Sequence, residues 1–285
     1  MTVGIAQRSE VLIDTATLAA NLDDPAIAIV EVDEDTGAFA VAHISGAVSF
    51  DWQEELHDLP RRDFVSQSRL ANLLGNKGIS AEQTIVLYGG NNNWFAAYAY
   101  WLFKLRGVEQ VKLLDGGRMK WELEDRPMTK VEKTVKPTTF AMGAERPELR
   151  AMRAEVIASG DGPTKLVDVR SPGEFSGEVM APPHLPQEQP YVGGHVPGAK
   201  NIPWSQAANE DGTFRTTKQL QALYEGKGVK ATEPVIAYCR IGERAAHTWF
   251  ALSELLGYPN VKNYDGSWTE YGSLVGVPVS TGPEA

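Results

Sequence analysis

The two halves of the chain repeat each other, and this repeat limits the possible folds more than any other feature of the sequence. Short matching blocks recur 150 to 152 residues apart. The matched blocks are 43–52 with 195–204, 85–88 with 235–238, and 114–117 with 264–267. A near-constant offset across three separate blocks predicts a tandem duplication. We therefore expect two copies of one fold, the first in residues 10–127 and the second in residues 151–280.

Within each half, apolar runs alternate with helical patterns. In the second half the predicted strands are 165–169, 235–238 and 261–264, and the predicted helices are 151–159, 217–224, 245–256 and 267–271. This alternation indicates a mostly parallel sheet with helices on both faces. The predicted fold class is therefore α/β, as a tandem duplication of two such domains.

Two stretches lie outside the repeat. Residues 128–150 are rich in Pro, Lys, Thr and Glu and show no periodicity, so we expect them to be the interdomain linker. Residues 177–194 contain four prolines and have no counterpart in the first half. We interpret them as an inserted surface loop. Whether this loop lies near the mouth of the site is not decided by the sequence.

Composition excludes several classes of function. With 285 residues, 42% hydrophobic content and a net charge of −10, the chain has the make-up of a globular protein that does not bind nucleic acids or membrane surfaces broadly. The five histidines and single cysteine show no ligand spacing, so we expect no metal site and no cofactor.

Composition also bears on the compartment and the oligomeric state. One cysteine cannot form an intrachain disulfide, and residues 1–10 lack the pattern of a secretory signal, so we expect a cytoplasmic protein. No apolar run approaches the roughly 20 residues that span a bilayer. We further expect a monomer, since one chain carries both copies of the fold.

That single cysteine, Cys239, is the strongest functional signal. It ends the apolar run 235–238 and opens a six-residue segment, 239–244, that we call the cysteine loop. A predicted helix follows, so the N–H groups of the loop and the positive end of the helix are expected to point at the sulfur. Arg240 and Arg244 add positive charge. The pattern predicts a nucleophilic thiol and an anionic substrate, and hence an enzyme.

The repeat supplies an internal comparison for this signal. Gly89 occupies the position of Cys239 in the first half, and its loop, 89–93, has neither a thiol nor an arginine. The first copy therefore cannot perform cysteine chemistry. His43 and His195 recur in both halves, including the half without cysteine, which indicates a structural role rather than a catalytic one.

Over nearly its whole length the chain resembles the two-domain rhodaneses, the thiosulfate sulfurtransferases. The resemblance rests on four segments: 167–170, 195–199, the cysteine loop and 264–268. It implies two rhodanese-like domains, of which only the second is catalytic. It also implies that Cys239 takes the outer sulfur of thiosulfate as a persulfide, releases sulfite, and passes the sulfur to cyanide or a thiol acceptor.

Three arginines are expected to bind the substrate. Arg240 and Arg244 lie in the cysteine loop, and guanidinium groups match the oxygens of a sulfonate well. The resemblance implies the same role for Arg170, at the end of the 165–169 strand.

The remaining loop residues are Ile241, Gly242 and Glu243. We expect Gly242 to serve a backbone conformation that side chains disfavour. Because a carboxylate inside the loop would oppose an anion, we expect Glu243 to point outward. Ala245 departs from the Ser or Thr that loops of this family often carry next, so any role of that hydroxyl is absent here.

Three alternatives remain open. The first is phosphatase or arsenate reductase activity: phosphatases of the same fold use a longer loop, Cys-x5-Arg, whereas Cys239 to Arg244 is Cys-x4-Arg, a smaller ring that suits a sulfur atom better than a phosphoryl group. A 3-mercaptopyruvate sulfurtransferase shares the fold and the cysteine, but its loops resemble Cys-Gly-Ser-Gly, with small residues where this chain has Arg240 and Ile241. A non-catalytic sulfur carrier or binding module would hold a persulfide without turnover.

Overall fold

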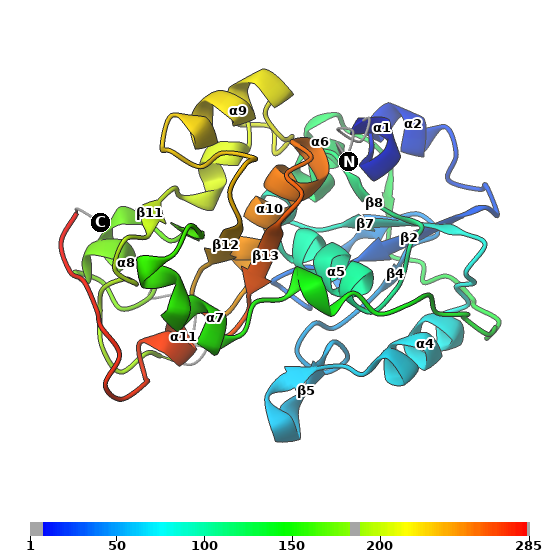
Figure 1. Cartoon of the computed structure of the whole chain (residues 1–285). Helices are drawn as coiled ribbons and strands as arrows, with labels where there is room; N and C mark the ends of the chain where they lie inside the picture. The colour runs from blue at the N-terminus through cyan, green and yellow to red at the C-terminus, as the bar shows by residue number, and fades with distance from the viewer. Residues whose placement is uncertain (1–7, 183–188, 284–285) are drawn as a thin grey trace. The chain divides into compact units, whose positions relative to one another are not determined.

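The computed structural model describes residues 8–182 and 189–283, and these form two compact units (Figure 1). The first unit runs up to Pro147 and also includes Asn209–Phe214. The second unit comprises Glu148–Ala208 and the chain from Arg215 onward. Of the predicted insertion 177–194, residues 183–188 lie outside the described residues.

The first unit is built on a five-stranded parallel sheet in the order β1-β8-β7-β2-β4. Its strands are β1 (Leu12–Ile13), β2 (Ile27–Glu31), β4 (Val48–Ser49), β7 (Thr84–Tyr88) and β8 (Val111–Leu114). The central strands β2 and β7 are buried along most of their length, as continuous apolar runs in a parallel sheet must be. Two short antiparallel pairs lie outside this sheet: β3 (His43–Ile44) with β9 (Met128–Thr129), and β5 (His57–Asp58) with β6 (Asp63–Phe64).

Helices connect the strands of the first unit. They are α1 (Arg8–Val11), α2 (Thr15–Ala19), α3 (Ala38–Val41), η1 (Leu59–Arg61), α4 (Gln67–Asn76), η2 (Asn91–Asn93), α5 (Trp94–Leu105) and α6 (Gly117–Leu123). Helix α5 packs against β7 and β8 and is buried on nearly all sides, which explains its apolar sequence.

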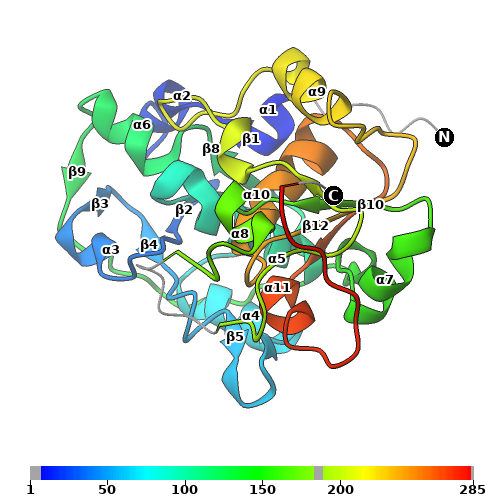
Figure 2. The same cartoon turned by 90° about the vertical axis from the view of Figure 1, so that its left-hand side faces the viewer.

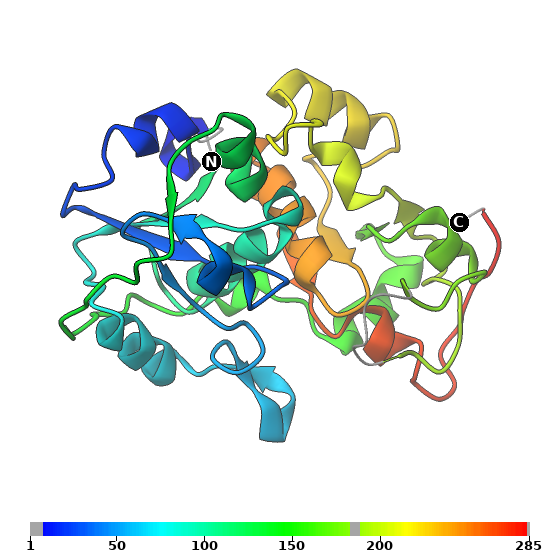
Figure 3. The ribbon, with the colours of Figure 1, turned by 180° about the vertical axis from the view of Figure 1, so that it is seen from behind.

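The second unit repeats the plan with a four-stranded parallel sheet in the order β11-β10-β12-β13. Its strands are β10 (Lys165–Asp168), β11 (Lys200–Asn201), β12 (Val235–Tyr238) and β13 (Val261–Tyr264). Its helices are η3 (Pro147–Leu149, shared with the end of the first unit), α7 (Arg153–Ala158), η4 (Ser159–Asp161), α8 (Pro172–Ser176), η5 (Trp204–Ala207), α9 (Thr217–Glu225), α10 (Glu243–Phe250), the π-helical η6 (Ala251–Leu255) and α11 (Ser267–Tyr271). The ribbon can be followed from behind in Figure 3. The predicted α/β class with parallel sheets is confirmed.

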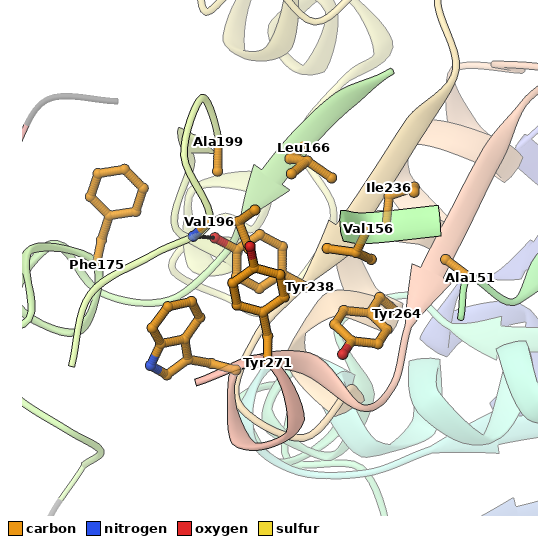
Figure 4. Close-up of a cluster of buried hydrophobic side chains, with 11 residues drawn as sticks. Ala151, Val156, Leu166, Phe175, Val196, Ala199, Ile236, Tyr238, Tyr264 and Tyr271 are labelled. Carbon is orange, nitrogen blue, oxygen red and sulfur yellow. Dashed lines mark hydrogen bonds between the residues drawn. The ribbon is translucent and has the colours of Figure 1, made fainter. Parts of the chain in front are cut away.

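The duplication extends to side-chain contacts in the core. In the second unit, the hydroxyl of Tyr238 accepts the N–H of Val196 at 3.2 Å, at the centre of a cluster of buried apolar side chains (Figure 4). In the first unit, the hydroxyl of Tyr88 accepts the N–H of Ile44 at 3.0 Å. Each tyrosine ends a central strand, and its hydroxyl accepts the buried N–H of the residue that follows the repeated histidine, His43 or His195.

The repeated histidines are structural. His43 Nδ1 lies 2.8 Å from the carbonyl oxygen of Phe39, and the two rings stack at 3.8 Å. His195 makes the same pair of contacts with Phe175, at 2.8 Å and 3.5 Å. Because both contacts also occur in the unit without a cysteine, they indicate that these histidines hold a turn, as the sequence predicts.

Much of the expected linker 128–150 packs along the first unit. The N–H of Thr138 donates to the carbonyl oxygen of Gly75, and that of Gly143 donates to the carbonyl oxygen of Gly107, each at 2.9 Å. Asn209–Phe214, from the second half of the sequence, also belongs to this unit: the N–H of Phe214 donates to Asp115 Oδ1 at 2.9 Å. In the described part of the chain, no helix combines the length and the apolar character needed to cross a bilayer.

We expect Tyr238→Phe and Tyr88→Phe each to lower the free energy of unfolding by about 1–3 kcal/mol, because a buried N–H loses its acceptor. Urea unfolding followed by tryptophan fluorescence measures this. The two variants serve as matched controls for each other, since the contact is the same in both units. A loss below about 0.5 kcal/mol in either would show that water or another group replaces the hydroxyl.

Candidate active site

Cys239 lies at the point where the second sheet meets a helix. It follows β12 directly, and α10 begins four residues later at Glu243. The thiol is buried, and its Sγ accepts the backbone N–H of Gly242 at 3.0 Å. An N–H donor and the positive end of a helix therefore face one sulfur atom, as the sequence predicts.

Gly242 has a conformation that other residues rarely adopt. Its φ is +102°, and a Cβ at this position would lie 2.7 Å from the Cα of Asp265. Its carbonyl oxygen accepts the side-chain amide of Asn263 at 3.0 Å, and this hydrogen bond fixes the peptide group between Gly242 and Glu243. A glycine is thus required both by the left-handed backbone and by the close approach of the neighbouring chain.

Ser267 holds the backbone of the cysteine, a role that the sequence analysis missed. Its hydroxyl accepts the N–H of Cys239 at 3.0 Å and donates to the carbonyl oxygen of Tyr264 at 2.6 Å. The carbonyl oxygen of Cys239 in turn accepts the N–H of Trp268 at 3.0 Å. The sequence does contain a sign of this role: the repeated blocks Asp-Gly-Gly and Asp-Gly-Ser differ at one position, which is Gly117 in the first half and Ser267 in the second.

In the first unit, the side chain of Asn93 holds the corresponding backbone in place of a serine. Gly89 stands where the cysteine would be, and its N–H donates to Asn93 Oδ1 at 3.0 Å. The amide of Asn93 donates to the carbonyl oxygen of Leu114 at 2.5 Å, which completes the bridge that Ser267 makes in the second unit. A Cβ on Gly117 would lie 2.1 Å from this Oδ1, so the asparagine excludes a serine there.

Arg244 is anchored by a carboxylate that the sequence analysis also missed. Its guanidinium donates two hydrogen bonds to Glu174, at 2.8 and 2.9 Å, and both side chains are buried. Burial by itself would raise the pKa of Glu174, but the hydrogen bonds and charge of Arg244 outweigh it and lower that pKa. The sequence could have indicated Glu174, because Ser171 and Glu174 have the spacing of a capping box, which they form at the start of α8.

Arg170 is buried just after the end of β10. Its guanidinium donates to Asp168 at 2.6 to 3.2 Å and to the carbonyl oxygen of Gly194 at 2.6 Å, and it stacks 4.8 Å from the ring centre of Trp268. The side chain is 1% exposed. These contacts tie the end of β10 to its neighbours, so the geometry favours a structural role over the substrate contact that the resemblance implies.

Arg240 and Ile241 occupy the turn of the cysteine loop. The carbonyl oxygen of Arg240 accepts the N–H of Thr269 at 3.0 Å, and its side chain is buried while Ile241 is half-buried. Burial, and then the neighbouring charge of Arg244, lower the pKa of Arg240. The loop thus holds two like charges close together.

Glu243 is buried, and the expectation that it points outward is wrong. It is 4% exposed as the first residue of α10. Burial raises the pKa of Glu243 to about 8, against the opposing charges of Arg244 and Arg240. Near neutral pH the carboxyl group is therefore largely uncharged, which removes the conflict with an anion that motivated the outward prediction.

A pocket of about 460 Å³ adjoins the loop on the side of Arg244. Its polar lining includes Arg244 and Glu174, on the helices α10 and α8 labelled in Figure 2, together with Ser171 and Ser205. Its apolar walls include Trp204 and two residues of the insertion, Val179 and Pro182. The insertion therefore reaches the neighbourhood of the site. Among the described residues, no three metal-ligating side chains converge on a point.

Comparison with known proteins places this geometry in a family. A family model described as a rhodanese-like domain matches residues 14–124 and again residues 154–274. The chain belongs to the rhodanese family. The two matches confirm the tandem duplication, and the second contains the cysteine loop.

Individual relatives agree with this assignment. A protein of Mycolicibacterium smegmatis, provisionally named thiosulfate sulfurtransferase, is 57% identical over 96% of this chain and 99% of its own length. A Thermus thermophilus protein named sulfur carrier protein TtuD is 47% identical over 96% of this chain and 98% of its own. The crystal structure of the Escherichia coli 3-mercaptopyruvate sulfotransferase SseA aligns with a TM-score of 0.75 at 30% identity, covering 90% of this chain and 98% of that one.

We expect Gly242→Ala to slow persulfide formation on Cys239 by about 10²–10³-fold, the effect of losing one preorganised N–H donor. The added Cβ clashes with Asp265 and moves the N–H away from the sulfur. Stopped-flow or quenched-flow mass analysis of the cysteine measures the rate. Gly228→Ala is the control: its φ is +80°, but nothing lies within 4 Å of the new Cβ. Equal losses in both variants would contradict the assignment.

The activity is expected to fall as the pH rises through about 8, because Glu243 then ionises beside an anionic substrate. The folded pKa lies above the ordinary 4.5, so the stability from neutral Glu243 is also complete below pH 4.5 and lost as pH rises through about 8. Rate and urea midpoints between pH 6 and 9 measure both. In Glu243→Gln, we expect the fall in rate and in urea midpoint above about pH 8 to disappear. If both quantities still fall in this variant, another group is responsible for the titration.

Proposed function

We propose that the protein is a thiosulfate sulfurtransferase that carries sulfur as a persulfide on Cys239. The observation that carries the proposal is the 3.0 Å hydrogen bond from the N–H of Gly242 to the buried Sγ, at the start of α10. This is the arrangement that stabilises a sulfur anion, first as thiolate and then as persulfide. Arg240 and Arg244 supply the positive charge for an anionic donor.

In the first half-reaction, the thiolate of Cys239 attacks the outer sulfur of thiosulfate. A new S–S bond forms to the protein while the S–S bond within thiosulfate breaks, and the electron pair of that bond leaves with sulfite. Sulfite is a stable anion, so no proton has to be delivered to the leaving group. Arg240 is the residue we propose to bind the sulfonate oxygens.

In the second half-reaction, a nucleophile attacks the outer sulfur of the persulfide. Cyanide forms thiocyanate and a thiol forms its own persulfide; in both cases the electron pair of the broken S–S bond returns to Cys239 as thiolate. Two half-reactions that share one covalent intermediate predict ping-pong kinetics. No step needs an external oxidant or reductant.

Two related functions are kept as outcomes of the test. The likeness to SseA favours 3-mercaptopyruvate as a donor, and the likeness to TtuD favours a carrier that passes sulfur to another protein. The charged side chain of Arg240, where the resemblance gives mercaptopyruvate enzymes a small residue, supports thiosulfate. A single reduced thiol suits the cytoplasm, where we propose that the protein works as a monomer with a small anionic donor and a thiophilic acceptor.

The test is the intact mass of wild type and Cys239→Ala after thiosulfate and then cyanide. We expect wild type to gain one sulfur, about 32 Da, with release of sulfite, and to lose it to cyanide. Cys239→Ala should gain nothing. An absent adduct, or one that persists in Cys239→Ala, would overturn the proposal. Comparison of kcat/KM for thiosulfate and 3-mercaptopyruvate separates the two enzymes, and a stable adduct without turnover indicates the carrier.

A further inference from the structure

Asn263 is a polar side chain at a place in the sheet where the first unit has an apolar one. It is the third residue of β13, pairs with Ala237 of β12 and is fully buried. The equivalent residue of β8 is Leu113, which pairs with Leu87 and is also fully buried. Strands inside a parallel sheet are normally apolar throughout, so the asparagine of the second unit calls for a physical reason.

The amide of Asn263 makes one hydrogen bond to the cysteine loop and leaves its own oxygen without one. Nδ2 donates to the carbonyl oxygen of Gly242 at 3.0 Å. Because a carbonyl oxygen can only accept, the NH2 group must face it and Oδ1 must face elsewhere. Within the described part of the chain, Oδ1 has no hydrogen-bond partner. A buried acceptor without a partner lowers the stability of the fold.

The carbonyl oxygen of Gly242 has a partner even without this amide. It also accepts the N–H of Ala246 at 3.1 Å, a regular bond of the first turn of α10. A backbone acceptor that is already paired gains little stability from a second donor. Asn263 therefore contributes little to the stability of the fold, and its effect lies in the geometry of the loop.

Gly242 is the residue at which the loop can most easily change its backbone angles. Its N–H, which donates to Cys239 Sγ, and its carbonyl group belong to two successive peptide groups. Since glycine has no Cβ, one of these peptide groups can turn against the other at little cost. The bond from Asn263 holds the second peptide group and so restricts the rotation that would turn the N–H away from the sulfur.

We propose that Asn263 is a positioning residue, which acts through the backbone of Gly242 to keep its N–H directed at the sulfur of Cys239. This inference rests on the proposed sulfur transfer and adds to it a residue from outside the cysteine loop. Asn263 acts through the loop and does not need to contact the sulfur donor or acceptor. The first unit has no thiol to position, and it carries leucine at this place.

The effect is expected in the half-reaction that returns Cys239 to a thiolate. When cyanide attacks the outer sulfur of the persulfide, a carbon–sulfur bond forms and the S–S bond breaks. The electron pair of that bond moves onto Sγ, so negative charge grows on the atom that faces the N–H of Gly242. A donor that is already in place stabilises this charge most. A looser loop therefore slows the step.

The experiment compares Asn263→Leu with wild type by two measurements. In the first, the protein is loaded with thiosulfate, freed of excess donor and mixed with cyanide in a single turnover. We expect thiocyanate formation to slow by about tenfold, the effect of one hydrogen bond. In the second, NMR follows hydrogen exchange of the Gly242 N–H, which should be faster in the variant. The urea midpoint should not fall, since leucine removes the unpaired Oδ1.

Three further variants separate positioning from packing. Val261→Ala removes buried atoms from the same face of β13 and should lower the urea midpoint at an unchanged rate of cyanide attack. Leu113→Asn places an amide at the equivalent position of the first unit and should do the same. Asn263→Ala lacks the donor and has no atoms that could crowd the loop, so it should be as slow as Asn263→Leu.

Several results would overturn the inference. A wild-type rate with wild-type exchange in Asn263→Leu would show that the amide does not position the loop. A lower urea midpoint at a wild-type rate would assign Asn263 a structural role alone. A normal rate in Asn263→Ala would show that leucine acts only by crowding the loop. If wild type forms no persulfide with thiosulfate, the proposed sulfur transfer has failed, and exchange of the Gly242 N–H then decides the positioning role by itself.

Discussion

The site depends on the backbone of Gly242, whose N–H donates to Cys239 Sγ and whose carbonyl oxygen, in the next peptide group, accepts the side-chain amide of Asn263. This N–H can face the sulfur only because the chain turns from β12 into α10 with a left-handed glycine. The same turn buries the side chain of the next residue, Glu243, and directs the last loop arginine toward α8. One backbone conformation thus places the thiol of Cys239, the N–H that donates to it and the surrounding charged residues.

The two units show which parts of this arrangement belong to the fold and which to the chemistry. Both keep the tyrosine that ends the central strand, the stacked histidine and a polar bridge beneath the loop. The bridge is Ser267 in one unit and Asn93 in the other. The fold therefore accepts either side chain for this hydrogen-bonded bridge. The thiol, in contrast, occurs only in the unit whose loop also carries arginines.

Two carboxyl groups shape the charge of the site that we propose to bind an anion. Glu243 is made largely neutral by burial at neutral pH, and Glu174 stays charged because it is paired with Arg244. The two acids therefore differ in how they would avoid repelling the proposed anionic donor. A carboxyl group takes up a proton where burial outweighs the nearby positive charges, and it keeps its charge where a guanidinium binds both of its oxygens.

The sequence alone determined the duplication, the α/β class and the cysteine loop, because repeats, apolar periodicity and a strand–loop–helix pattern are local signals. It could not decide what each charged residue touches. Glu174 reaches Arg244 across 70 positions, and the guanidinium of Arg170 donates to the carbonyl oxygen of Gly194 across 24 positions. Glu243 is buried for the same reason: only the packing of α10 sets its exposure. Such contacts depend on how distant segments meet in space, and the tertiary structure decided them.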